Sequence, residues 1–173
     1  MVSTAYKIIG ISGSLRTAST NTALIQAVAN MAPKDRIASI EIVNYKDVPV
    51  YDGDVEDASG IPKTVQEIAD KIKAADGLYI CTPEYNYSTS GALKNLIDWL
   101  SRCKNNPLHG KPAAIASCCA GPSGGLRAVY DLRKILIFLK PHTMELPELS
   151  VAANYMKFDK SSPPTITDEQ VKK

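Results

Sequence analysis

The stretch YKIIGISGSLRTASTN, Tyr6 to Asn21, decides the fold class. Its first part, Tyr6–Ser12, is an apolar run that predicts a buried strand. A polar loop follows. A helical pattern then begins, and its apolar residues lie on one face: Leu24, Ala27, Val28 and Met31. Pro33 ends that pattern. A strand, a loop and a helix in this order are the opening of a βαβ unit.

The rest of the chain repeats this alternation, which predicts an α/β protein with a parallel sheet in one domain over residues 1–173. The further strands are expected at 38–44, 77–82 and 112–119, with a short fifth one near 143–146. Helical stripes lie between them, at 61–72, 93–100 and 126–139. Thr167 could cap a final helix, but the chain stops within two turns. We therefore expect the last helix to be truncated.

The composition excludes several classes of function. The net charge is +2, and no basic run is interleaved with aromatic residues, so we expect no nucleic-acid partner. The apolar runs are too short to span a bilayer, and the first residues lack the apolar core of a signal peptide. These features predict a cytoplasmic protein without a membrane partner.

A metal site is not expected either. The four cysteines form no C-x-x-C motif, and there are only two histidines, His109 and His142, which we expect at the surface or in loops. Cys118 and Cys119 are adjacent at the end of an apolar run. Buried strand thiols explain this pair better than a redox role does.

Three loops that follow predicted strands are rich in Gly, Ser, Pro and Asn: residues 13–21, 82–91 and 119–125. In open α/β sheets, ligands bind beyond the carboxyl ends of the strands, where these loops should meet. No loop matches the P-loop, and the first lacks the Rossmann glycine pattern. A nucleophile elbow is also absent, because Ser14 stands where that motif needs its last glycine.

The first loop has the chemistry of an anion site. It enters a helix N-terminus, where backbone N–H groups are free and the helix dipole is positive. Arg16 adds a cation that can bind phosphate through two donors. A capped helix entry with a surface arginine explains the loop equally well.

The second and third loops suit a planar ligand. Pro83 stiffens the second loop, and Tyr85 and Tyr87 offer flat amphipathic surfaces, although ordinary packing also explains each tyrosine. The glycines of the third loop permit close approach of the backbone, or simply a strand-to-helix turn. Arg102 and Arg127 are candidates for a nucleotide phosphate contact, although an ordinary surface role explains each of them better.

These motifs together resemble the NADPH-dependent FMN reductase family, and in particular its bacterial chromate and quinone reductase branch. The resemblance rests on GSLRTASTN, TPEYNYSTSGALKNLIDWLSR and the CAGPSGG turn, and it covers about Tyr6 to Phe158. It implies a flavodoxin-like, doubly wound, five-stranded parallel sheet of order 2-1-3-4-5 with helices on both faces. It also implies that the FMN phosphate contacts Ser14, Arg16, Ser19, Thr20 and Asn21, and the flavin ring Pro83, Glu84, Tyr85, Asn86, Ser117, Gly121, Gly124 and Gly125.

The activity implied by the resemblance is oxidation of NADPH or NADH through FMN, with quinone, azo, chromate or flavin-type acceptors. The flavin performs the chemistry, so no catalytic side chain and no metal are expected. The family also implies a homodimer or homotetramer. The alternatives are a non-catalytic flavodoxin-like electron carrier and a flavin-binding sensor. The chain departs from the family at Thr20, where many relatives have an aromatic residue, and in its shortened C-terminal helix.

Overall fold

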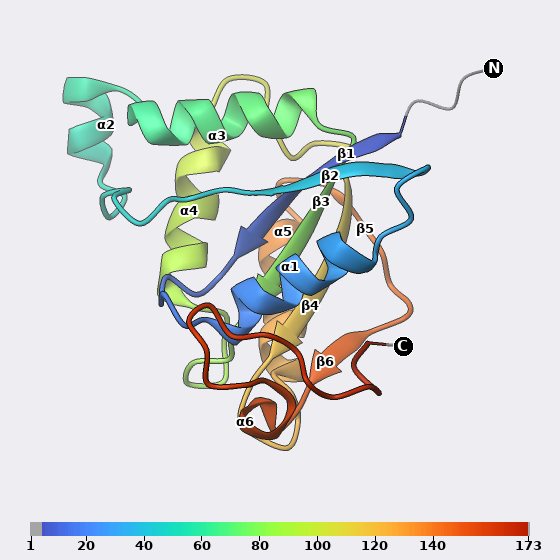
Figure 1. Ribbon diagram of the computed structural model, residues 1–173. Helices are drawn as coiled ribbons and strands as arrows, with labels where there is room; N and C mark the ends of the chain where they lie inside the picture. The colour runs from blue at the N-terminus through green and yellow to red at the C-terminus, as the bar shows by residue number, and fades with distance from the viewer. Residues whose placement is uncertain (1–4, 173) are drawn as a thin grey trace.

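The computed structural model describes residues 5–172, which form an α/β sandwich around a parallel sheet (Figure 1). The sheet order is β2-β1-β3-β4-β5, as the resemblance implies, and all strand pairs are parallel. Its strands and the helices between them are β1 (Tyr6–Ser12), α1 (Thr20–Met31), β2 (Ile37–Ile42), α2 (Gly53–Ser59), α3 (Lys63–Ala74), β3 (Gly77–Thr82), α4 (Gly91–Arg102), β4 (Pro112–Cys118), α5 (Leu126–Leu136) and β5 (His142–Thr143).

The prediction of five strands was wrong at the edge of the sheet. A sixth strand, β6 (Leu149–Val151), pairs with the carboxyl half of β4, whereas β5 pairs with its amino half. The two short strands therefore share one edge position. The chain leaves the ladder between them, and Pro147 in this gap has no N–H to donate to a ladder.

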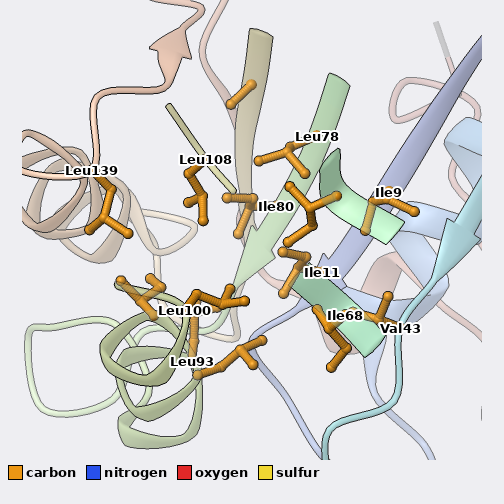
Figure 2. Close-up of a cluster of buried hydrophobic side chains, with 14 of the residues drawn as sticks. Ile9, Ile11, Val43, Ile68, Leu78, Ile80, Leu93, Leu100, Leu108 and Leu139 are labelled. Atoms are coloured by element: carbon orange, nitrogen blue, oxygen red, sulfur yellow. The ribbon is translucent and has the colours of Figure 1, made fainter. Parts of the chain in front are cut away.

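The larger core lies between the sheet and the helices α3, α4 and α5. Isoleucines and leucines on one face of β1, β3 and β4 meet the apolar stripes of these helices (Figure 2). Val65, Ile68 and Ile72 of α3 are buried here, as the period of the sequence predicts. The helix itself begins only at Lys63, with Pro62 as the residue before its first turn.

The opposite face is covered by α1 and by the C-terminal segment, drawn in red in Figure 1. After a four-residue helix, α6 (Asn154–Lys157), the segment continues without a further helix over residues 158–172. Phe158 and Ile166 pack into this second core beside Leu24. The predicted helix start at Thr167 was wrong: the Thr167 N–H donates instead to the Lys157 carbonyl at 2.9 Å.

The burial of the cysteines and histidines agrees with expectation. Cys118 is buried and Cys119 is partly buried, and both are free thiols. His109 and His142 are exposed. Within residues 5–172, no helix is long and apolar enough to cross a membrane.

Candidate functional site

A hollow of about 270 Å³ opens where the carboxyl ends of β1, β3 and β4 meet, the place predicted for a ligand. Eight of the predicted site residues line it: Ser14, Arg16, Ser19, Thr20, Asn21, Pro83, Glu84 and Tyr85. Larger hollows exist elsewhere, but they lie over apolar surface away from the three polar loops. The structure thus brings the first and second loops together.

The start of the first loop is fixed by two hydrogen bonds. Gly13 N–H donates to the Cys81 carbonyl at 2.7 Å, and Tyr45 Oη donates to the Ser12 carbonyl at 2.6 Å. A side chain on Gly13 would come within 2.9 Å of Pro83, so only glycine allows the first two loops to lie this close. Burial raises the pKa of Tyr45 well above its ordinary value, which keeps its hydroxyl a donor.

The N-terminus of α1 presents free donors to the hollow. Ser19 is the N-cap, and its Oγ accepts from the Thr22 N–H at 3.1 Å. The first helical bond runs from the Ala23 N–H to the Ser19 carbonyl, so the N–H groups of Thr20 and Asn21 precede the helical ladder. Arg16 is exposed at the rim, and within residues 5–172 its guanidinium makes no ion pair or side-chain hydrogen bond.

The side chain of Asn21 is directed into the protein. Its Nδ2 donates to the Cys118 carbonyl at 2.9 Å, and its Oδ1 accepts from the Cys118 N–H at 3.1 Å and from the Cys81 thiol at 3.2 Å. This amide therefore joins the start of α1 to the end of β4. Thr20 Oγ1 accepts from Asn154 Nδ2 at 2.8 Å, which ties the same turn to α6.

The second loop makes a tight turn beside the hollow. Tyr85 and Ser88 exchange backbone hydrogen bonds of 2.9 and 3.1 Å, and Asn86 and Tyr87 between them have φ values of 50° and 67°. Asn86 lies at the exposed tip of this turn, outside the lining of the hollow. Tyr85 remains 48% exposed, so its ring is available to a ligand.

Glu84 has the most distinctive environment in the second loop. Its N–H donates to Cys119 Sγ at 2.9 Å, and its Oε1 lies 2.8 Å from Arg127 Nη1. The side chain is 13% exposed, and Oε2 is buried with no hydrogen-bond partner within the described residues. Arg127 also lies over the Tyr87 ring, 4.2 Å from its centroid.

The residues in and just before the third loop that were expected to contact the ligand lie outside the lining of the hollow: Ser117, Gly121, Gly124 and Gly125. Ser117 is fully buried, and its Oγ donates to the Gly124 carbonyl at 2.7 Å. Gly124 and Gly125 have φ values of 63° and 91°, and they turn the chain from β4 into α5.

Four residues that line the hollow were not predicted: Cys118, Cys119, Ala120 and Asn154. Cys118 is the last residue of β4, and Cys119 and Ala120 follow it. The sequence placed this end of the strand at the site but did not show which side chains face a ligand. Asn154 lies in the C-terminal segment and carries no motif, so only the folded chain places it beside Thr20.

Comparison with known proteins agrees with the fold and identifies the family. Residues 6–155 match the NADPH-dependent FMN reductase family. The chain is 44% identical over 153 residues to an NAD(P)H-dependent FMN reductase of Pseudomonas aeruginosa, covering 88% of this chain and 81% of that protein. It is 43% identical over 150 residues to a quinone reductase of Escherichia coli K12, covering 85% and 78%.

Among solved structures, the flavoenzyme NAD(P)H:(acceptor) oxidoreductase of Paracoccus denitrificans aligns with a TM-score of 0.82 and 28% identity. The alignment covers 96% of this chain and 88% of that one. The sheet order, the family match and the relatives all point to a flavodoxin-like reductase, and they do not favour the alternative of an electron carrier. The chain belongs to the NADPH-dependent FMN reductase family, whose members are flavodoxin-like NAD(P)H oxidoreductases.

Proposed function

We propose that the hollow binds FMN and that the chain uses it to oxidise NADH or NADPH. The observation that carries this proposal is a set of donors without a partner among residues 5–172: the backbone N–H groups of Thr20 and Asn21 at the N-terminus of α1, and the guanidinium of Arg16 beside them. A phosphate ester fits this donor set, because the helix end and the arginine both favour a dianion.

The residues have different tasks in this proposal. Arg16 and the N-terminus of α1 bind the phosphate, together with the hydroxyls of Ser14, Ser19 and Thr20. Asn21 acts mainly by holding α1 against β4, since both atoms of its amide are already bonded. Pro83, Glu84, Tyr85 and Asn86 flank the flavin ring. Ser117, Gly121, Gly124 and Gly125 shape the third loop behind it.

Bound FMN supplies the redox chemistry, which is transfer of a hydride from NAD(P)H and of two electrons to an acceptor. The protein needs no acid or base for this. The exposed histidines at 109 and 142, both outside the hollow, agree with such a mechanism. The main contribution of the protein is to orient the flavin ring. Pro83 and Cys119, which line the hollow, would exclude water from one face of that ring.

For the acceptor we propose a quinone first, because a relative of this name shares 43% identity over most of both chains. Azo compounds, chromate and free flavin are the other acceptors that the same open site would admit. Tyr85 and Tyr87, which are 48% and 72% exposed, offer aromatic surface on which a flat acceptor could stack.

We also propose a cytoplasmic homodimer or homotetramer. Large apolar side chains are exposed just after α5, at Ile137 and Phe138 (73% and 79%), and between β5 and β6, at Leu146 (77%). Exposed apolar surface of this kind is typical of a protein interface. The cytoplasm is where NAD(P)H would be available to such an enzyme.

The test compares FMN with riboflavin, which lacks the phosphate. Wild-type protein should retain FMN through desalting, and NADPH or NADH should bleach its visible bands under anaerobic conditions. Arg16→Ala should weaken FMN binding about 10- to 100-fold, the value of one charge-assisted contact pair, and leave riboflavin binding unchanged. Arg36→Ala is the matched control, because Arg36 is exposed just before β2 and lies outside the hollow.

Two outcomes would contradict the proposal. Unchanged FMN affinity in Arg16→Ala would remove this residue from the phosphate site. Retained flavin that neither nucleotide reduces would support the sensor or carrier alternative instead.

A further inference from the structure

We propose that the ion pair Glu84–Arg127 controls how much more tightly the site binds reduced FMN than oxidised FMN. In this inference Glu84 is a fixed negative charge in the wall of the flavin site, and Arg127 is the partner that offsets it. The inference rests on the proposed function, since it assigns a role toward the bound flavin.

The position of Glu84 lets its charge act electrostatically on a ligand in the hollow. The residue lines the hollow, and its N–H donates to Cys119, which lines the same wall. Its side chain is 13% exposed, so water screens the charge only weakly. One carboxylate oxygen has Arg127 as partner, and the other is buried with none among the described residues.

Arg127 lies on the outer side of the pair. It is the second residue of α5, it is not part of the lining of the hollow, and its side chain is 46% exposed. Its guanidinium is held by Ser123 Oγ at 3.2 Å and by the face of the Tyr87 ring. The negative end of the pair therefore belongs to a residue that lines the hollow, and its positive end belongs to a more exposed residue outside that lining.

This orientation matters because two-electron reduction adds negative charge to the flavin ring near neutral pH. A carboxylate in the wall disfavours that charge, and a guanidinium behind it partly cancels the effect. Removing Glu84 should then favour the reduced form, and removing Arg127 should disfavour it. The two substitutions are expected to act in opposite directions.

A purely structural role predicts a different result. The pair also fastens the loop after β3 to the first turn of α5, 43 residues later in the chain. If fastening were its only role, Glu84→Gln and Arg127→Gln would weaken binding of both forms of FMN alike. The ratio of the two dissociation constants would then stay at the wild-type value.

The experiment measures the dissociation constant of oxidised FMN by fluorescence and the midpoint potential of the bound flavin by dye equilibration at pH 8. Together these give the ratio of the oxidised to the reduced dissociation constant. We expect this ratio to rise about tenfold in Glu84→Gln and to fall about tenfold in Arg127→Gln. The double variant should return to within about threefold of wild type.

A second ion pair provides a matched control. Arg102 and Glu56 are also 2.8 Å apart, with 51% and 18% of their side chains exposed, but they join α4 to α2 and do not line the hollow. Glu56→Gln and Arg102→Gln should leave the ratio unchanged. Arg127→Lys keeps the charge and should also leave it within about threefold of wild type.

The outcomes separate this inference from the proposed function. Wild-type protein that binds no FMN would contradict the function itself. Normal binding and reduction by NAD(P)H, with the same ratio in wild type, Glu84→Gln and Arg127→Gln, would overturn the inference alone. Shifts of the same sign in both single variants would overturn it as well.

Discussion

Asn21→Ala should lower the free energy of unfolding by about 2–4 kcal/mol. The substitution leaves the N–H and the carbonyl of Cys118 without their side-chain partner, and an unpaired buried group costs about 1–3 kcal/mol. The sum of the two is about 2–6 kcal/mol. Both residues border the hollow, so water can replace part of the lost bonding, and the lower half of that range is expected.

Urea denaturation followed by the fluorescence of Trp99, the single tryptophan, would measure this loss. Asn30→Ala is the control, because Asn30 lies at the exposed end of the same helix and should change stability by less than about 0.5 kcal/mol. An Asn21→Ala protein within that limit would refute the conclusion that this amide joins α1 to β4. Weaker FMN binding should accompany the loss, since the N-terminus of α1 would no longer be held in place.

Three further predictions follow from the site and its surroundings. Gly124→Ala should lower the free energy of unfolding by at least about 2 kcal/mol, because φ is 63° there and the new Cβ would lie 2.8 Å from backbone atoms of β6. Gly121→Ala, where a Cβ meets no atom within 4 Å, should be neutral. Equal melting temperatures of the two variants would contradict this. Burial raises the pKa of both Cys118, to about 11, and the less buried Cys119. A thiol reagent at pH 8 should label Cys119 faster than Cys118, and FMN should protect Cys119; equal labelling rates would refute this. The hydrogen bond from Arg102 lowers the pKa of Glu56 in the folded state. The stabilisation by this ion pair is therefore present above the ordinary pKa of glutamate, about 4.3, and is lost as the pH falls below it, so the stability difference between wild type and Glu56→Gln should shrink on acidification.

The main features of the fold could be predicted because they depend on strong local patterns. β3 is buried along nearly its whole length, as expected for an apolar run without polar alternation. Helix α2 had no such signal. Its sequence GDVEDAS buries no residue, and it is held by the cap at Asp52 and by the pair of Glu56 with Arg102. The ion pair depends on α4, which is distant in the sequence.

The C-terminal segment shows the limit of local reasoning more clearly. The pattern around Thr167 is a fair helix start, with a capping residue followed by acidic ones. In the folded chain, Ile166 instead packs against the face of the sheet beside α1, and the Thr167 N–H bonds to the chain around α6. Tertiary contacts decide the conformation here, and a local capping pattern does not include them.

The polar residues of the three loops predicted the place of the site correctly, but most of their side chains hold the loops in position and are not left free to contact a ligand. Their hydroxyl and amide groups are largely bonded within the protein: Ser19 caps α1, Thr20 meets Asn154, Asn21 meets Cys118, and Ser117 meets Gly124. What remains for a ligand is mainly the N–H groups at the start of α1 and the guanidinium of Arg16. The short polar side chains hold three loops in fixed positions, so that few groups need to be ordered when the ligand binds. Such a site should therefore tolerate the loss of a single hydroxyl better than the loss of Asn21, although both residues belong to the same motif.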